Sequence, residues 1–209
     1  SKFDYIIFAV KPSDLKTVLH EFKNFKFSTK TVVISIIAGK KIKIFKKYFK
    51  NLNNFFRVMP NMPASIGKSM NCIVSNRTAN KEIKNEVVNL FSYSGKTHFL
   101  KNENQIDMAT AISGSGPGFI FNIIDAMENA AIKLGFNKNT SNLLVAQTFK
   151  GSIDLMINNN IPAKNLVKSV ATKGGTTEAG IKIMNKNKIH KTFTEVVNAS
   201  YKKAREYRK

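Results

Sequence analysis

The feature that most constrains the fold is a pair of apolar runs, residues 5–10 (YIIFAV) and 31–37 (TVVISII), that carry no polar face. Such runs are typical of parallel strands that are covered on both sides. The first run ends at residues 11–12 (Lys-Pro) and the second at residues 38–39 (Ala-Gly). Residues 54–59 predict a third strand, and helical patterns separate the three. Strands that alternate with helices imply right-handed parallel crossovers, so we expect an α/β domain.

A further strand at residues 69–74 and an amphipathic helix at residues 80–92 extend this domain. After Lys101 the pattern changes to helical periodicity. Helices are expected at residues 105–112, 117–134, 140–158 and 190–208. We therefore predict a partial α/β domain at residues 1–102 and an all-helical domain at residues 103–209.

The long helix expected from residue 117 is entered through a turn of small residues, 111–118 (AISGSGPG). Ser115 can cap the free N–H groups of this helix, Pro117 lies where a missing N–H does no harm, and Gly135 ends the helix. Three glycines within five residues allow another backbone or a flat ligand to come close. A turn that only lets helices pack would need the same residues, so both interpretations stay open.

A second suggestive stretch, residues 169–180 (SVATKGGTTEAG), places two glycines between helices. A short helix from Pro162 is expected to end near Ala171, and another is expected to start at about Thr177. Exposed N–H groups and threonine hydroxyls there would form a pocket for a carboxylate or phosphate. An ordinary helix–turn–helix with threonine capping is the alternative.

The net charge of +21 comes from lysines that are spread through nearly every segment. This spread indicates a compositional bias rather than one binding face, so we expect no nucleic-acid partner, although the field would attract anionic substrates and cofactors. Cys72 is the only cysteine, which favours a reducing, cytoplasmic setting. The start of the chain lacks the pattern of a signal peptide, and serines, glycines and a proline interrupt the uncharged residues 108–124, so we expect no membrane span.

Ligands of open parallel sheets lie outside the carboxyl ends of the strands, which are expected here at residues 9–12, 38–39 and 59–61. The same turns could be simple strand exits. The three histidines are dispersed and no carboxylates are paired at catalytic spacing, so we expect no metal.

Four motifs together resemble the pyrroline-5-carboxylate reductase family in order and approximate spacing. They are Ala9-Val10-Lys11-Pro12, Arg57-Val58-Met59-Pro60-Asn61-Met62-Pro63-Ala64, Ser113-Gly114-Ser115-Gly116-Pro117 and Gly174-Gly175-Thr176-Thr177. The resemblance implies a Rossmann-like parallel-sheet domain that holds NADPH or NADH, and a helical domain that forms a homodimer or a higher homo-oligomer. The implied reaction is the reduction of 1-pyrroline-5-carboxylate to L-proline, the last step of proline biosynthesis.

The resemblance also implies roles for individual residues. The cofactor would lie along Ala9, Val10, Lys11, Pro12, Ala38, Gly39, Ser113 and Gly114. The substrate would bind at Gly174, Gly175, Thr176, Thr177 and Glu103, with the Thr177 hydroxyl as the catalytic donor to the ring nitrogen.

The family pattern is not complete in this sequence. No strand followed by a G-x-G-x-x-G turn precedes the first motif, so we expect a Rossmann-like domain without its first βαβ unit and pyrophosphate-binding glycines. Two hypotheses follow. The first is an active reductase, and the second is a non-catalytic remnant that keeps only its helical dimerisation domain as an interaction module.

Overall fold

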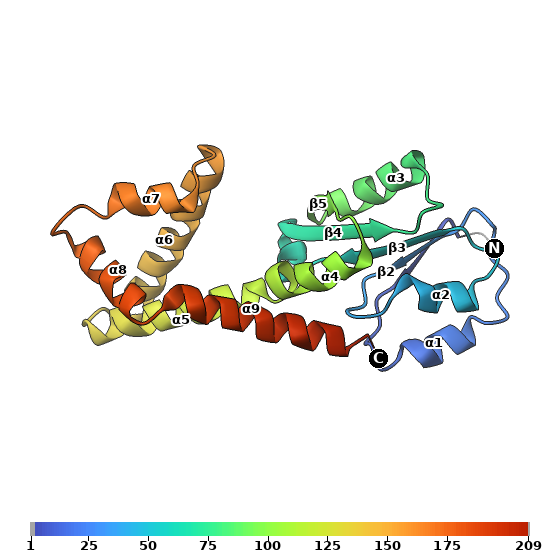
Figure 1. The fold of residues 1–209 in the computed structure, drawn as a ribbon, viewed down its shortest axis with the longest axis horizontal. Coiled ribbons are helices and arrows are strands. Elements are labelled where there is room, and N and C mark those ends of the chain that lie inside the picture. The colour runs from blue at the N-terminus through green and yellow to red at the C-terminus, as the bar shows by residue number, and fades with distance from the viewer. Residues whose placement is uncertain (1–2, 209) are drawn as a thin grey trace. The chain divides into compact units, whose positions relative to one another are not determined.

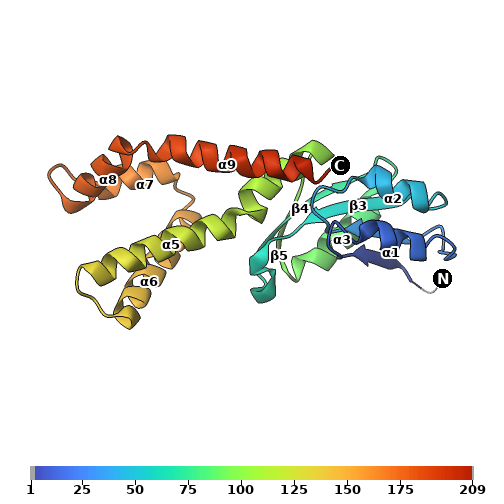
Figure 2. The same ribbon diagram turned by 90° about the horizontal axis from the view of Figure 1, so that it is seen from below.

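The computed structural model describes residues 3–208, which form two compact units (Figures 1 and 2). The sheet unit comprises residues 3–117 and 197–208, and the helical unit comprises residues 118–196. The predicted domain boundary at residues 102–103 stays a prediction, and these units divide the chain at other positions.

The order of the elements agrees with an α/β region followed by helices. The strands are β1 (Tyr5–Phe8), β2 (Val32–Ser35), β3 (Asn54–Met59), β4 (Ser69–Ser75) and β5 (Gly95–Phe99). The helices among and after them are α1 (Leu15–Glu21), α2 (Ile42–Tyr48), the 3-10 helix η1 (Met62–Ile66), α3 (Lys81–Ser92), α4 (Glu103–Ala109) and the π-helix η2 (Thr110–Gly114). The remaining helices are α5 (Gly116–Lys133), α6 (Lys138–Asn158), α7 (Ala163–Val170), α8 (Thr176–Lys186) and α9 (Ile189–Glu206).

The sheet has the strand order β1-β2-β3-β4-β5. β1, β2 and β3 are parallel, which confirms the predicted crossovers through α1 and α2. β4 is antiparallel to β3, because the short connection between them holds only η1 and no crossover helix. β5, which the sequence did not predict, lies parallel to β4 at the other edge.

Helices cover both faces of the sheet, with α1 and α2 on one face and α3 on the other (Figure 1). Alternation along the strands sends Phe55 toward α1 and α2 and Phe56 toward α3. α4 packs on β4 through Ile106, against Cys72 and Val74.

The expectation that the first apolar run is covered on both sides is wrong for two of its residues, Ile7 and Ala9, which are exposed. β1 is the edge strand, and Ile7 is 47% exposed, whereas Phe8 is buried against α1 and α2. Apolar content alone does not distinguish a half-covered edge strand from a central one.

The predicted helix boundaries around α5 are largely confirmed. Pro117 lies in its first turn, and Gly135 adopts φ +106 just beyond its end. The Ser115 hydroxyl lies 2.9 Å from that of Ser200 and hydrogen-bonds with it, and its role as a cap stays a prediction.

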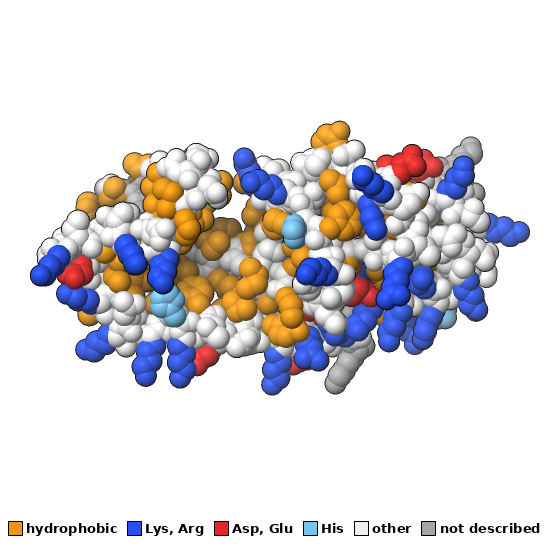
Figure 3. Space-filling model, turned by 45° about the horizontal axis from the view of Figure 1, so that its top comes forward, with side chains coloured by type: hydrophobic (Ala, Val, Ile, Leu, Met, Phe, Trp, Pro, Cys, Tyr) orange, Lys and Arg blue, Asp and Glu red, His pale blue; other side chains and the backbone are white. Residues whose placement is uncertain are grey.

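The helical unit buries few side chains of its own. Among its described residues only Ser141 and Val145 are buried, while Phe121, Leu134 and Leu143 are between 53% and 83% exposed. Apolar side chains are accordingly visible over its surface, on the left of Figure 3. Within residues 3–208, no helix has the length and apolar character needed to cross a membrane.

Candidate functional site

The carboxyl ends of β1, β2 and β3 meet at one edge of the sheet. Phe8 is in register with Ser35, and Ser35 with Arg57, so the segments that follow these strands lie side by side. The structure therefore brings together the predicted cofactor residues of two segments, which are Ala9, Val10, Lys11 and Pro12 after β1, and Ala38 and Gly39 after β2. We call this the cofactor edge.

The π-helix η2 brings Ser113 and Gly114 to the same edge. The Asn61 side chain, just after β3, donates a hydrogen bond to the Ser113 carbonyl (2.9 Å). A Cβ added to Gly114 would lie 3.1 Å from Cε of Met59, the last residue of β3. The predicted cofactor residues, all in the sheet unit, thus gather around neighbouring strand ends. Two of them lie in the π-helix, a form of helix that is frequent at functional sites.

Asn61 fixes this arrangement from both ends of its amide. Its Nδ2 donates to Ser113 and its Oδ1 accepts from the backbone N–H of Met70 (3.0 Å).

We expect Asn61→Ala to lower the free energy of unfolding of the sheet unit by about 1–3 kcal/mol, because both partners lose their hydrogen bond. All five tyrosines, at positions 5, 48, 93, 201 and 207, lie in this unit, so urea unfolding followed by tyrosine fluorescence reports on it alone. Asn24→Ala, at an exposed loop position, is the control, and equal stability of both variants would contradict the assignment.

Gly39 is constrained by the protein itself. It is buried with φ +75, and a Cβ there would collide with Tyr207 near the C-terminal end of α9. The glycine is therefore required both by its backbone angle and by a close approach of the chain.

Glu103 holds α4 against the sheet and α2. Its Oε1 accepts from the backbone N–H of Ile42 (2.9 Å) and from Nη1 of Arg57 (3.2 Å). Arg57 also faces buried Asp107, with 3.7 Å between Nη2 and Oδ1, and Asp107 accepts from Nε of Arg208. The Glu103 side chain is 28% exposed and already carries two contacts, so its predicted role at the substrate stays a prediction.

Cys72 lies close to this edge but does not offer a nucleophile. Its Sγ is 4.0 Å from the Ser113 hydroxyl, and burial raises the pKa of the thiol, which favours the protonated form. Within residues 3–208, no cluster of His, Cys, Asp and Glu side chains could hold a metal ion.

Apart from Glu103, which lies in the sheet unit, the predicted substrate residues lie in the helical unit, at the start of α8. Gly174 adopts φ +77, and its N–H donates to the carboxylate of Glu178 (2.9 Å). The Gly175 N–H donates to the Thr172 carbonyl (3.0 Å). The turn therefore does receive a carboxylate, although this one belongs to the chain. The Gly174 N–H and then Lys182 hold the pKa of Glu178 below its usual range, so the side chain is ionised at neutral pH.

Sequence reasoning placed Arg57 and Asn61 in a family motif, and Asn61 at a strand end, but it predicted no contact for either side chain and did not single out Asp107. In β3, Arg57 appears only as one polar residue within an apolar strand, NFFRVM. A buried cation in such a strand requires a buried acid as its partner. The arginine in β3 was therefore the one sign in the sequence that an acid such as Asp107 is buried beside it.

Known proteins match this chain over nearly its whole length. A family model described as pyrroline-5-carboxylate reductase dimerisation matches residues 103–207. Pyrroline-5-carboxylate reductase 2 of Bacillus subtilis is 31% identical over 203 residues, which are 97% of this chain and 72% of that protein. The pyrroline-5-carboxylate reductase of Arabidopsis thaliana is 32% identical over 204 residues, again 97% and 72%.

Solved structures of the same name share the fold. A pyrroline-5-carboxylate reductase from Coxiella burnetii superposes with a TM-score of 0.91 at 32% identity, covering 99% of this chain and 76% of that one. Plasmodium falciparum pyrroline carboxylate reductase, crystallised with NADP bound, gives 0.90 at 30% identity, covering 99% and 78%. The resemblance drawn from the sequence is confirmed, and the chain belongs to the pyrroline-5-carboxylate reductase family.

Proposed function

We propose that this chain reduces 1-pyrroline-5-carboxylate to L-proline with NADPH or NADH, as the last step of proline biosynthesis. The observation that carries the proposal is the convergence of the predicted cofactor residues at one sheet edge, in a chain of this family. The reaction needs an anchored carboxylate, a hydrogen-bonded or protonated ring nitrogen and a dry site, and it needs neither a metal nor a nucleophile. Its setting is proposed to be the cytoplasm.

The cofactor edge has the chemistry that a nicotinamide dinucleotide requires. Ala9 is exposed, and Val10, Pro12 and Ala38 are partly buried. All four are small or apolar, so they suit a flat ring, and exposed Lys11 suits a phosphate. When bound, the cofactor supplies the hydride. Ser113 and Gly114 would bound the ring on the side of β3, held there by Asn61.

At the start of α8, the backbone N–H groups of the turn would bind the substrate carboxylate, with Gly174, Gly175 and Thr176 shaping it. The Thr177 hydroxyl would donate a hydrogen bond to the ring nitrogen. Glu178 occupies one of these N–H groups in the structure, so the substrate would have to take its place.

The partner is proposed to be a second copy of the chain. The helical unit exposes large apolar side chains such as Phe121, Leu134 and Leu143 and buries almost none, which a dimer or higher homo-oligomer would cover. The family model that matches this part of the chain is described as a dimerisation model.

The proposal is tested by measuring NADPH and NADH oxidation with 1-pyrroline-5-carboxylate, together with cofactor binding by nicotinamide fluorescence. Turnover that depends on both reactants supports it. Absence of both turnover and cofactor binding would leave the chain as a non-catalytic interaction module.

Removing the charge of Glu178 should strengthen substrate binding at the start of α8. We expect Glu178→Gln to lower KM for 1-pyrroline-5-carboxylate by about two- to fivefold, because a neutral amide oxygen competes less strongly than a carboxylate for the Gly174 N–H. Steady-state kinetics over substrate concentration would measure it. Glu195→Gln, which breaks a similar exposed i,i+4 pair with Lys191, is the matched control. An unchanged or higher KM would argue against the turn as the carboxylate site.

A further inference from the structure

A broad cleft lies in the sheet unit, where α2 and α4 begin. It has a volume of about 610 Å³ and is lined by residues 41–43 and 46, 75–78 and 101–104. It shares none of these residues with the predicted cofactor or substrate sets except Glu103. Three segments that are distant in sequence therefore form one concave surface.

This cleft is strongly cationic. Lys41, Lys43, Lys46, Arg77 and Lys101 account for five of its twelve lining residues, against 34 Lys and Arg in the 209 residues of the chain. The lining of the cleft is therefore richer in cations than the chain as a whole. Within residues 3–208 none of these five side chains has an ion-pair partner, and like charges held in a concave surface strengthen the local field.

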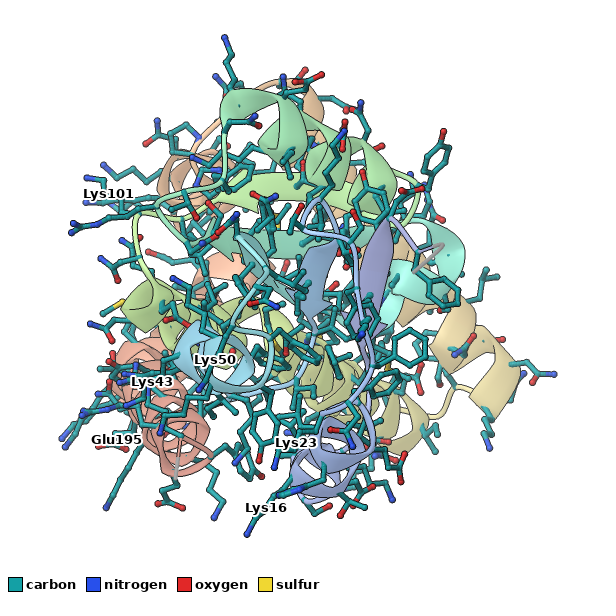
Figure 4. All side chains as sticks on the ribbon, turned by 90° about the vertical axis from the view of Figure 1, so that its right-hand side faces the viewer. Lys16, Lys23, Lys43, Lys50, Lys101 and Glu195 are labelled. Carbon is teal, nitrogen blue, oxygen red and sulfur yellow. The ribbon has the colours of Figure 1, made fainter. Side chains whose placement is uncertain are left out.

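The one acid of the cleft does not neutralise these cations. Oε1 of Glu103 accepts hydrogen bonds from the buried guanidinium of Arg57 and from the Ile42 N–H. Lys43 and Lys101 extend toward the same side of Figure 4, although they come from α2 and from the turn before α4.

The walls of the cleft are held in place by internal hydrogen bonds. The Asn76 amide donates to the Asn53 carbonyl (2.7 Å) and accepts from the Phe55 N–H (3.0 Å), which fixes the turn that carries Arg77. On the facing turn, Oδ1 of Asn102 accepts from the N–H of Asn104 (3.0 Å). Among residues 3–208 the amide nitrogen of Asn102 has no hydrogen-bond acceptor, so it can donate to a ligand. The arrangement offers cations and amide donors on a preformed support.

We propose that this cleft binds a linear polyphosphate chain, either free or carried by a nucleoside. A single carboxylate or phosphate can meet only one or two of the five cations, whereas a chain of three phosphates spans several, and Arg77 offers a bidentate fork. No aromatic side chain lines the cleft, so the phosphates and not a base are recognised. This inference is independent of the proposed reductase activity.

The test is calorimetric titration of the full chain, without substrate or cofactor, with inorganic tripolyphosphate and separately with ATP. We expect similar dissociation constants for the two, both rising with salt. The variant K43Q/R77Q/K101Q, exposed at all three positions, should raise both constants at least tenfold.

The control variant K23Q/K26Q/K50Q removes the same number of positive charges from a second cavity of the sheet unit. That cavity has a volume of about 540 Å³, and Phe25 and Phe27 also line it. The control variant should change both dissociation constants less than twofold, and thermal melting of both variants checks that they fold.

Equal weakening in both variants, binding of ATP alone, or no binding would overturn the proposal. Loss of binding in K11Q instead would assign the anion to the cofactor edge and also overturn it, whether or not the chain is a reductase. Tighter binding of an oligothymidylate, lost equally in both triple variants, would point to a nucleic acid instead.

Discussion

Replacing Arg57 by methionine is expected to destabilise the sheet unit by about 3–5 kcal/mol, because the exchange leaves buried carboxylate charge without its partner. The Arg57 side chain is 2% exposed and the Asp107 side chain is completely buried. Methionine fills a similar volume but offers no donor, so Asp107 would depend on Arg208 alone, and Glu103 on the Ile42 N–H.

Urea unfolding at fixed protein concentration, followed by tyrosine fluorescence, measures this loss in the unit that contains Arg57. Lys150→Met, which breaks an exposed i,i+4 pair with Asp154 in α6, should leave the transition unchanged. The triple variant R57M/E103Q/D107N removes the acids as well and should recover part of the stability. A triple variant less stable than R57M would show that lost volume, not unpaired charge, is the cause.

The sequence allowed the centre of the sheet to be predicted because its strands are short, mostly apolar runs. β3 (Asn54–Met59) has the predicted bounds, and β4 and α3 differ by one residue at one end each. β5 (Gly95–Phe99) was missed because its residues alternate between half-buried and exposed, with a lysine and a histidine outward, in only five positions. The reversed direction of β4 follows from a connection too short for a crossover helix, and an apolar pattern carries no sign of direction.

The site was predictable as far as it depends on strand ends. Parallel strands must deliver their exits to one edge, so residues 9–12 and 38–39 could be placed together before the structure was known. The neighbours of Ser113 could not be predicted, since its contact with Asn61 spans 52 positions in the sequence and requires the π-helix. The same holds for Glu103, whose partner Arg57 lies 46 positions away on another element. Long-range pairs of polar groups leave no periodic trace in a sequence.

Replacing Thr177 by valine is expected to lower kcat for 1-pyrroline-5-carboxylate reduction about 100-fold, with a smaller change in KM. This expectation rests on the proposed function. Valine keeps the shape of threonine and removes only the hydroxyl, which is proposed to donate to the ring nitrogen as that nitrogen gains electron density. A donor placed for the transition state contributes about 100-fold or more in rate. The substrate carboxylate would still meet the backbone of the turn, so ground-state binding should persist.

Steady-state kinetics separates the two effects, and the conservative variant distinguishes a hydroxyl from a merely structural side chain. Thr177→Ser should recover most of kcat, because it restores the donor while losing the methyl group. Thr192→Val, in α9, makes the same exchange at an exposed helical position and should leave kcat within twofold. If Thr177→Val retained kcat, or lost it without recovery by serine, the proton would have to come from another group. Glu103 would not be a ready substitute, because two hydrogen bonds already hold its Oε1 in the sheet unit.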